Sequence, residues 1–184
     1  MSEDKETFER ELKFPGVDHN ELRARLLELE AERLAPSSFE DNLIFDRDGE
    51  LTERGSLLRL RSDRQGAHLT FKGPAQYEGK MKVREEIETS VDDASHARSL
   101  LEGLGFSVVK RYQKQREEWR LGGVIVALDK TPIGDFAEFE GEGAEKLARR
   151  CSLDPENAER RSYVRLYEEY RLENPEAPDE MVFP

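Results

Sequence analysis

The sequence predicts an α+β protein in which eight antiparallel strands close into a barrel, a tunnel with a charged lumen, and helices pack on the outside. Three observations lead to this fold class. Most predicted strands alternate charged and apolar residues with a period of two. Two long amphipathic helices separate the strands and can cover their apolar faces. Charged residues make up 38% of the chain, against 36% hydrophobic residues, and many of these charges fall on strands.

The first strand shows the pattern that the later strands repeat. Residues 8–14 alternate so that Glu9, Glu11 and Lys13 fall on one face. The opposite face is apolar apart from Arg10. Taken alone, this segment fits an ordinary half-buried strand with a solvated charged face. The recurrence of the alternation along the chain favours a charged face that is turned inward instead.

The remaining elements follow in a regular order. A helix from His19 to Leu34 begins at Asp18, with Glu21 as its capping-box partner, and ends before Pro36. Further strands are predicted over residues 39–45, 57–61, 68–72, 82–88, 106–120, 124–129 and 136–140, a second long helix between Asp92 and Gly105, and helical segments over 143–151 and 155–170. One strand, one helix and three strands thus occur twice in succession, which indicates a pseudo-repeat.

Length and composition limit the kinds of protein that this chain can be. We expect a single domain over residues 1–174, and an acidic, proline-containing and mobile tail over 175–184. The net charge of −12 argues against a general affinity for nucleic acid or acidic membranes. A single cysteine, Cys151, excludes an internal disulfide and a cysteine-rich metal site. Without an apolar leader or a membrane helix in the sequence, we expect a soluble cytoplasmic protein that is a monomer or a homodimer.

The charges on the alternating faces are numerous enough to line a tunnel. Eight strands are about the number that closes into a small barrel, and helices on the outer wall would leave the charged faces inside. An open sheet with its charged face in water is one alternative. A membrane barrel is another, but the helices between the strands argue against it. The inward-facing set comprises the acids Glu9, Glu11, Glu86, Glu88, Asp129, Glu138 and Glu140, and the bases Lys13, Arg59, Arg61, Lys72, Lys82, Arg84, Lys110, Lys114 and Arg116.

A lumen with many cations and several carboxylates suits a small polyanion that is bound together with a divalent metal. Arginine and lysine bind phosphate oxygens, and arginine often does so through two hydrogen bonds. Carboxylates hold Mg²⁺ or Mn²⁺, which are hard ions that take further ligands from substrate phosphates. Without a ligand the crowded cations would repel one another, and an anion as highly charged as a triphosphate would relieve that repulsion.

The ordered motifs of the chain resemble those of the CYTH superfamily, the triphosphate tunnel metalloenzymes. Residues 9–13 carry the Glu-x-Glu-x-Lys signature. The motifs that follow are Leu-Arg-Leu-Arg (58–61), Thr-Phe-Lys-Gly (70–73), Arg-x-Glu-x-Glu (84–88), Lys-x-Arg (114–116), Leu-Asp (128–129) and Gly-Asp-Phe-Ala-Glu-Phe-Glu (134–140). The resemblance covers roughly residues 5–168 and implies an eight-stranded antiparallel tunnel that binds a small-molecule triphosphate and a divalent metal.

The resemblance also implies roles for individual residues. The metal ions, Mg²⁺ or Mn²⁺, would be held by Glu9, Glu11, Glu138 and Glu140. The phosphates would be bound by Lys13, Arg59, Arg61, Lys72, Arg84, Lys114 and Arg116, with Lys110 as a further candidate because it shares the inward parity. The residues expected to take part in catalysis are Lys13, Arg59, Lys72 and Asp129. Glu86 and Glu88 are open to two interpretations, as functional acids or as structural partners of neighbouring cations.

Two reactions are compatible with the same set of residues. Attack by water gives a triphosphatase acting on inorganic triphosphate, thiamine triphosphate or a nucleoside triphosphate. Attack by the ribose 3′-hydroxyl of ATP gives cyclic AMP and pyrophosphate, as in class IV adenylate cyclases. We favour hydrolysis of a phosphoanhydride bond and keep the cyclase as the alternative. A non-catalytic polyphosphate- or nucleotide-binding module is less favoured, because all four candidate metal carboxylates are present.

Overall fold

A computed structural model describes residues 8–184 of the chain. The strands are β1 (Phe8–Pro15), β2 (Glu32–Asp46), β3 (Leu57–Asp63), β4 (Gly66–Lys72), β5 (Gln76–Glu78), β6 (Met81–Val91), β7 (Ser107–Leu121), β8 (Val124–Thr131) and β9 (Gly134–Glu140). The helices are α1 (His19–Glu28), α2 (Glu50–Glu53), α3 (Ala94–Gly103), α4 (Ala144–Arg150) and α5 (Tyr163–Glu173), with a 3₁₀ turn, η1, over Pro155–Asn157. The short elements α2 and β5 lie in segments that were expected to be loops.

Eight of these strands form a closed antiparallel barrel. The strand order is β1-β9-β8-β7-β2-β3-β4-β6-β5, and β1 also pairs with β6, which closes the barrel. The short strand β5 is the extra member and pairs only with the start of β6. The predicted eight-stranded antiparallel barrel is therefore confirmed, and its closure leaves an inner and an outer face on every strand.

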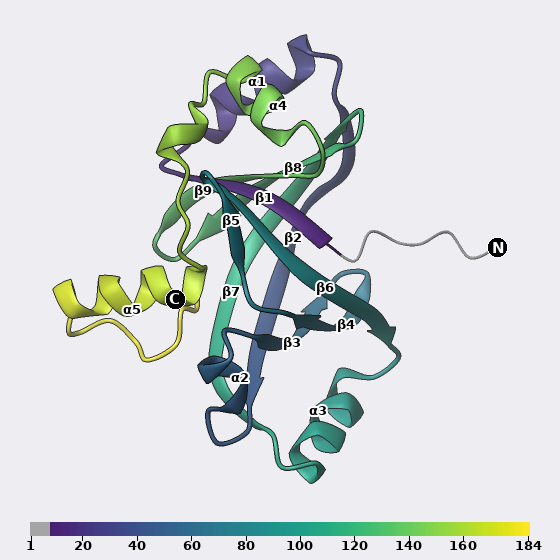
Figure 1. Cartoon of the computed structure of the whole chain (residues 1–184), viewed down its shortest axis with the longest axis vertical. Coiled ribbons are helices and arrows are strands. Elements are labelled where there is room, and N and C mark those ends of the chain that lie inside the picture. The colour runs from purple at the N-terminus through teal and green to yellow at the C-terminus, as the bar shows by residue number, and fades with distance from the viewer. Residues whose placement is uncertain (1–7) are drawn as a thin grey trace.

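Helices cover the apolar outer faces of the strands. Figure 1 shows α1 and α4 together at one end of the molecule and α3 at the opposite end. Leu26 of α1 and Leu147 of α4 pack with Leu12 of β1 in one hydrophobic cluster. Leu101 of α3 packs with Phe45 of β2 in another. Because the outer faces are buried in this way, the charged faces of the strands are turned into the lumen.

The first helix ends earlier than the sequence predicted. The predicted segment extended to Leu34, whereas α1 ends at Glu28 and β2 already begins at Glu32. Glu30 adopts a left-handed conformation with φ of 59°, and the amide of Ala31 donates a hydrogen bond to the carbonyl of Leu26. This is the C-terminal geometry that glycine usually provides, so no residue type in the sequence marked the end of the helix.

The last helix forms an apolar wall on one side of the lumen. Tyr163 and Tyr167 of α5 cluster with the inward side chains Ile44, Tyr112 and Phe136. The rings of Phe136 and Tyr163 meet edge to face with centroids 5.1 Å apart.

The C-terminal segment is docked in the structure, which differs from the mobile tail expected over residues 175–184. Met181 is only 1% exposed. Its amide donates to the carbonyl of Arg111, and its carbonyl accepts from the amide of Gln113. β8 pairs with β7 only from Gln115 onward, so the adjoining stretch of the β7 edge is free to bond with this segment. No helix within residues 8–184 combines the length and apolar character needed to cross a membrane.

Candidate functional site

The inward faces of the strands enclose a charged cavity of about 290 Å³. The predicted metal and phosphate residues that line it are Glu9, Glu11, Glu138, Glu140, Lys13, Arg59, Arg61, Lys72, Arg84, Lys114 and Arg116. The other lining residues are Leu57, Lys82, Glu86, Glu88, Tyr112, Glu118, Ser162, Tyr163 and Val164. The structure thus brings almost all of the predicted site residues into one lumen, and only Lys110 and Asp129 are absent from its lining.

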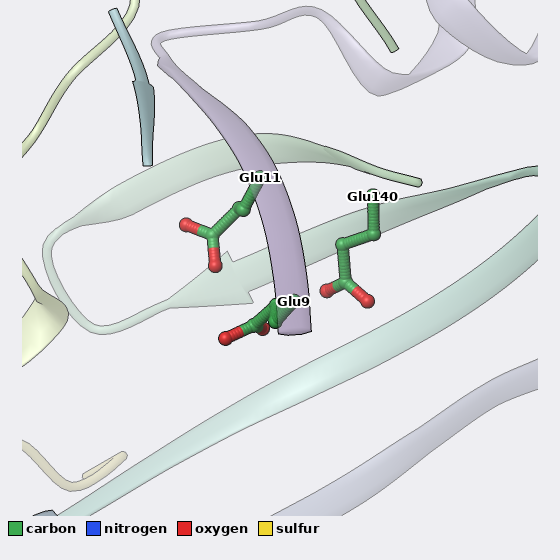
Figure 2. Close-up of side chains that lie close together, drawn as sticks. All are labelled: Glu9, Glu11 and Glu140. Carbon is green, nitrogen blue, oxygen red and sulfur yellow. The ribbon is translucent and has the colours of Figure 1, made fainter. Parts of the chain in front are cut away.

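Three carboxylates meet at one place in this cavity. Figure 2 shows Glu9 and Glu11 on β1 and Glu140 on β9, with their carboxylates directed into a common space. One oxygen of each lies within 4.8 Å of the corresponding oxygens of the other two. The strand register explains the meeting, because Glu11 lies directly opposite Glu140. We call Glu9, Glu11 and Glu140 the acidic trio.

The acidic trio fits a divalent metal ion. Burial, together with the neighbouring Glu9, raises the pKa of Glu140 to about 8, although Arg116 opposes the shift. Part of this shift comes from repulsion by Glu9, Glu138 and Glu11, which a divalent cation among the three carboxylates would relieve. Carboxylate oxygens are the ligands that Mg²⁺ and Mn²⁺ prefer. The predicted role of Glu9, Glu11 and Glu140 as metal ligands is therefore compatible with their placement.

Glu138 has different neighbours, although it lies only two residues before Glu140 on β9. Its Oε1 is 3.3 Å from the Nζ atom of Lys13, and its Oε2 accepts a hydrogen bond from Arg116. Burial alone would raise its pKa, but Lys13 and Arg116 hold the pKa of Glu138 well below its usual range. Glu138 thus acts as a counter-ion of two cations in this structure, and its predicted role as a metal ligand remains a prediction.

Asp129 is fully buried beneath the cavity lining and is surrounded by donors. Its oxygens accept hydrogen bonds from Lys114 at 2.9 Å, from Arg116 at 2.6 and 2.7 Å, and from the hydroxyl of Tyr163 at 2.8 Å. Although burial would raise its pKa, Arg116 and Lys114 hold the pKa of Asp129 below its usual range. These contacts support a role in positioning Lys114 and Arg116 rather than the direct part in catalysis that was predicted.

The cations on β3 and β4 lie beside the acids of β6, because β4 pairs with β3 on one side and with β6 on the other. The Nη2 atom of Arg59 lies 3.9 Å from Glu86 and 3.7 Å from Glu88, and it donates a hydrogen bond to Thr70 at 3.3 Å. The Nε atom of Arg59 has no hydrogen-bond partner within residues 8–184. Arg61 lies 3.4 Å from Glu88. The contacts of Arg59 to the two acids are long, so its guanidinium is incompletely paired with carboxylates in this structure.

Two predicted phosphate-binding residues are engaged elsewhere. Arg84 lines the cavity, but its Nε and Nη2 atoms donate to the carbonyl of Gly73 at 2.9 and 2.6 Å. Lys110 shares the inward parity of Lys114, yet it lies further along β7 toward α5, where its Nζ atom is 2.9 Å from Glu168. The structure therefore corrects the placement of Lys110, because parity identifies a strand face and not the position along the lumen.

Several residues near the site were missed by the sequence reasoning. Glu40, which is 4% exposed, lies 3.6 Å from Lys114, and Glu118 lines the cavity. Strand alternation could have identified both. Glu118 has the same parity as Lys114 and Arg116 on β7, and Glu40 lies directly opposite Lys114 on β2. The ring of Tyr163 lies 4.3 Å from the Nζ atom of Lys13, a cation–π contact. Tyr163 is on a helix, and no periodic pattern connects that helix to the lumen.

A closed barrel whose cations and carboxylates face one lumen defines a class of proteins suited to a polyanion and a divalent metal. The model of the CYTH domain family matches residues 7–163, and the chain belongs to this family. The resemblance stated from the sequence motifs is thereby confirmed.

Individual relatives agree with the family assignment. A protein of Methanocaldococcus jannaschii that carries the name "putative adenylate cyclase" is 26% identical over 173 residues, which cover 86% of this chain and 98% of the relative. A solved structure from Vibrio parahaemolyticus with the same designation is 24% identical, with a TM-score of 0.79 over 89% of this chain and 99% of the other. An adenylyl cyclase candidate from Hippeastrum, whose structure was described with a dominant triphosphatase activity, is 20% identical, with a TM-score of 0.57 over 91% of this chain and 88% of the other.

Proposed function

We propose that this protein is a divalent-metal-dependent enzyme that hydrolyses a phosphoanhydride bond of a triphosphate, with inorganic triphosphate, thiamine triphosphate and nucleoside triphosphates as the candidate substrates. One observation carries the proposal: eight lysine and arginine side chains line a single cavity beside the acidic trio. The uncharged lining residues are Leu57, Tyr112, Ser162, Tyr163 and Val164. A lining dominated by charge supports recognition of phosphate groups over recognition of a nucleobase.

The residues of this chain would divide the work on the substrate. Arg59, Arg61 and Lys72 would bind phosphate oxygens from β3 and β4, and the contacts of Arg59 to Glu86 and Glu88 are long enough to be exchanged for phosphate. Lys114 and Arg116, held by Asp129, would bind from β7 and are positioned before the substrate arrives. A Mg²⁺ or Mn²⁺ ion held by the acidic trio would supply Lewis-acid polarisation of phosphate oxygens.

A second candidate is the conversion of ATP to cyclic AMP and pyrophosphate by a class IV adenylate cyclase. The name of the Methanocaldococcus jannaschii relative favours it. The Hippeastrum protein, however, combines a cyclase name with a dominant triphosphatase activity on the same fold. The same set of phosphate-binding cations would serve both reactions, because each reaction displaces a phosphate leaving group from a bound triphosphate. The reactions differ in the nucleophile, which is water or the ribose 3′-hydroxyl, and in the phosphorus atom that is attacked, which is the α-phosphorus in the cyclase.

Product analysis distinguishes these functions. The purified protein is supplied separately with inorganic triphosphate, thiamine triphosphate and ATP, each with Mg²⁺ or Mn²⁺, and the products are separated by anion-exchange chromatography. We expect orthophosphate from at least one substrate, with turnover that disappears when EDTA is added. Cyclic AMP with an equal amount of pyrophosphate would replace the proposal by the cyclase. The absence of any product with all three substrates would contradict both functions.

A variant of Arg59 tests whether this cation binds phosphate. Arg59→Ala should weaken substrate use by roughly 2–4 kcal/mol, the scale for a partner lost from a close charged pair. The melting temperature of the metal-free protein should change little, because the contacts of Arg59 to Glu86 and Glu88 are long. Triphosphate should raise the melting temperature of the wild type more than that of the variant.

The matched control for Arg59→Ala is Arg47→Ala, which removes an exposed arginine that pairs with Glu50 on the surface. Its response to triphosphate should equal that of the wild type. If Arg59→Ala also keeps the full response, and its melting temperature without ligand collapses, then Arg59 is a structural residue and its assignment to phosphate binding is wrong.

A further inference from the structure

Each carboxylate of the acidic trio is in contact with a cation that is a candidate for phosphate binding. Glu9 lies 2.8 and 2.9 Å from the Nζ atom of Lys72. Glu11 lies 3.4 Å from the Nζ atom of Lys13, and Glu140 lies 3.7 Å from Arg116. The groups that fit a metal ion and the groups that fit phosphate therefore neutralise one another in the ligand-free protein.

The pair between Lys72 and Glu9 is the closest of the three, and it engages both oxygens of the carboxylate. Lys13 and Arg116 share a second acid, Glu138, which Lys72 does not contact. Burial, the largest influence, would lower the pKa of Lys72, but Glu9, Glu86 and Glu11 together raise the pKa, and Glu9 has the largest effect of the three. Glu9 is therefore the dominant counter-ion that keeps Lys72 charged at this position.

Lys72 also has a second acid within reach. Its Nζ atom lies 3.1 Å from the Oε2 atom of Glu86, which is not a member of the acidic trio. The register places Glu86 directly opposite Lys72 on the neighbouring strand. If Glu9 were withdrawn, Lys72 would keep this partner and would not be left as an isolated buried charge.

We propose that Glu9 exchanges partners during ligand binding: Lys72 is its counter-ion in the free protein, and a divalent metal ion takes the place of Lys72 when it binds to the acidic trio. The released ammonium group, which remains beside Glu86, then binds a phosphate oxygen of the substrate. This exchange rests on the proposed function, and it specifies how the binding of the metal ion and the binding of triphosphate depend on each other. Lys72 competes with the metal in the absence of triphosphate, and it contributes to binding once metal and triphosphate are both present.

The exchange also gives Glu86 a defined part. In the free protein Glu86 is the secondary partner of Lys72, and after the exchange it is the acid that holds Lys72 in the cavity. Glu86 therefore needs no contact with the metal to matter for binding. This assignment separates Glu86 from Glu88, whose closest cations are Arg61 at 3.4 Å and Arg59 at 3.7 Å.

The test measures Mn²⁺ binding to the full chain without triphosphate, by electron paramagnetic resonance of free Mn²⁺. Removal of the competing ammonium in Lys72→Met should tighten Mn²⁺ binding about tenfold relative to wild type. Lys72→Gln, which keeps a hydrogen-bond donor near Glu9 without the charge, should tighten it in the same direction and is the second variant if Lys72→Met does not fold. With inorganic imidotriphosphate present, both variants should bind Mn²⁺ more weakly than wild type.

Arg61→Met is the matched control, because Arg61 lines the same cavity but pairs with Asp63 and Glu88 and not with the acidic trio. Its Mn²⁺ affinity without triphosphate should change less than about twofold. Unchanged or weaker Mn²⁺ binding in the Lys72 variants would overturn the exchange, and so would an equal tightening in Arg61→Met. If the wild type binds no Mn²⁺ at all, the metal site fails, and with it both the exchange and the proposed function.

Discussion

Glu138 and Glu140 lie two residues apart on the same face of β9, but their surroundings are opposite. Glu138 lies between Lys13 and Arg116, and these cations hold its pKa well below the usual range. Glu140 has a longer contact to Arg116, at 3.7 Å, and burial together with the neighbouring acids Glu9, Glu138 and Glu11 raises its pKa to about 8. One acid has an excess of positive partners, and the other has too few.

The comparison separates the lumen into two regions. Around Glu138 and Asp129, every charge has a close partner, and the network holds Lys114 and Arg116 in place. Around Glu140, negative charge is incompletely balanced, and a cation from solution can be accommodated. The first region resembles a structural network, and the second resembles a binding site. The number of charged residues in a lumen is thus less informative than the way in which they are paired.

The largest effect is expected from a substitution in the balanced region. Asp129→Asn removes the buried carboxylate that accepts hydrogen bonds from Lys114 and Arg116, so two buried cations lose their shared counter-ion. The free energy of unfolding should fall by about 3–5 kcal/mol, the scale for breaking a buried ion pair. Urea unfolding at neutral pH measures the change.

Glu140→Gln is the matched control for Asp129→Asn. It replaces a carboxylate whose charged form is disfavoured by folding at neutral pH, so the metal-free variant should be at least as stable as the wild type. An equal loss of stability in the two variants would contradict the difference in charge balance between the region around Asp129 and the region around Glu140.

A smaller effect is expected from pH. Because folding raises the pKa of Glu140, the protonated carboxyl stabilises the metal-free protein; this contribution is complete below the ordinary pKa of 4.5 and is lost as pH rises through about 8. The side chain of Glu140 is 29% exposed, so water reduces the size of the effect. A metal ligand must be ionised, so Mn²⁺ affinity should rise with pH up to about 8, with release of at most about one proton per ion below it.

Calorimetry in two buffers of different ionisation enthalpy counts the protons released when Mn²⁺ binds. The pH dependence should flatten in Glu140→Gln, which has no proton to lose at this position. A wild-type affinity that stays constant from about pH 6 to about pH 9 would contradict the raised pKa.

The barrel and its charged lumen were predictable because both follow from strand alternation. Glu9, Arg59 and Lys114 lie in the lumen as their parity predicted. Parity did not reveal that Lys110 lies beyond the cavity, because parity gives the face of a strand and not the position along it, and Lys110 lies four residues before Lys114 on β7, beside Glu168. The first helix was predicted too long for a different reason. It is followed by Glu30 in a left-handed conformation, and no glycine marks this position in the sequence.

The pairing of charges within the lumen could not be predicted in the same way. Glu138 and Glu140 are indistinguishable by spacing and residue type, and only the neighbours supplied by other strands give them opposite pKa shifts. The buried position of Asp129 depends in part on Tyr163, which reaches it from a helix 34 residues away in sequence. Such contacts join segments that no local pattern relates.

The central claim is that the acidic trio, and not the network around Glu138, holds the metal ion. The most direct test titrates Mn²⁺ into the wild type, Glu140→Gln and Glu138→Gln without triphosphate, after circular dichroism has shown that each protein is folded. We expect Glu140→Gln to weaken Mn²⁺ binding by more than about 100-fold, because the loss of a metal ligand should exceed the roughly 10–100-fold effect of losing an outer-sphere partner. Glu138→Gln should weaken Mn²⁺ binding by less than about 100-fold. Near wild-type Mn²⁺ affinity in Glu140→Gln, with loss of binding in Glu138→Gln, would contradict the account.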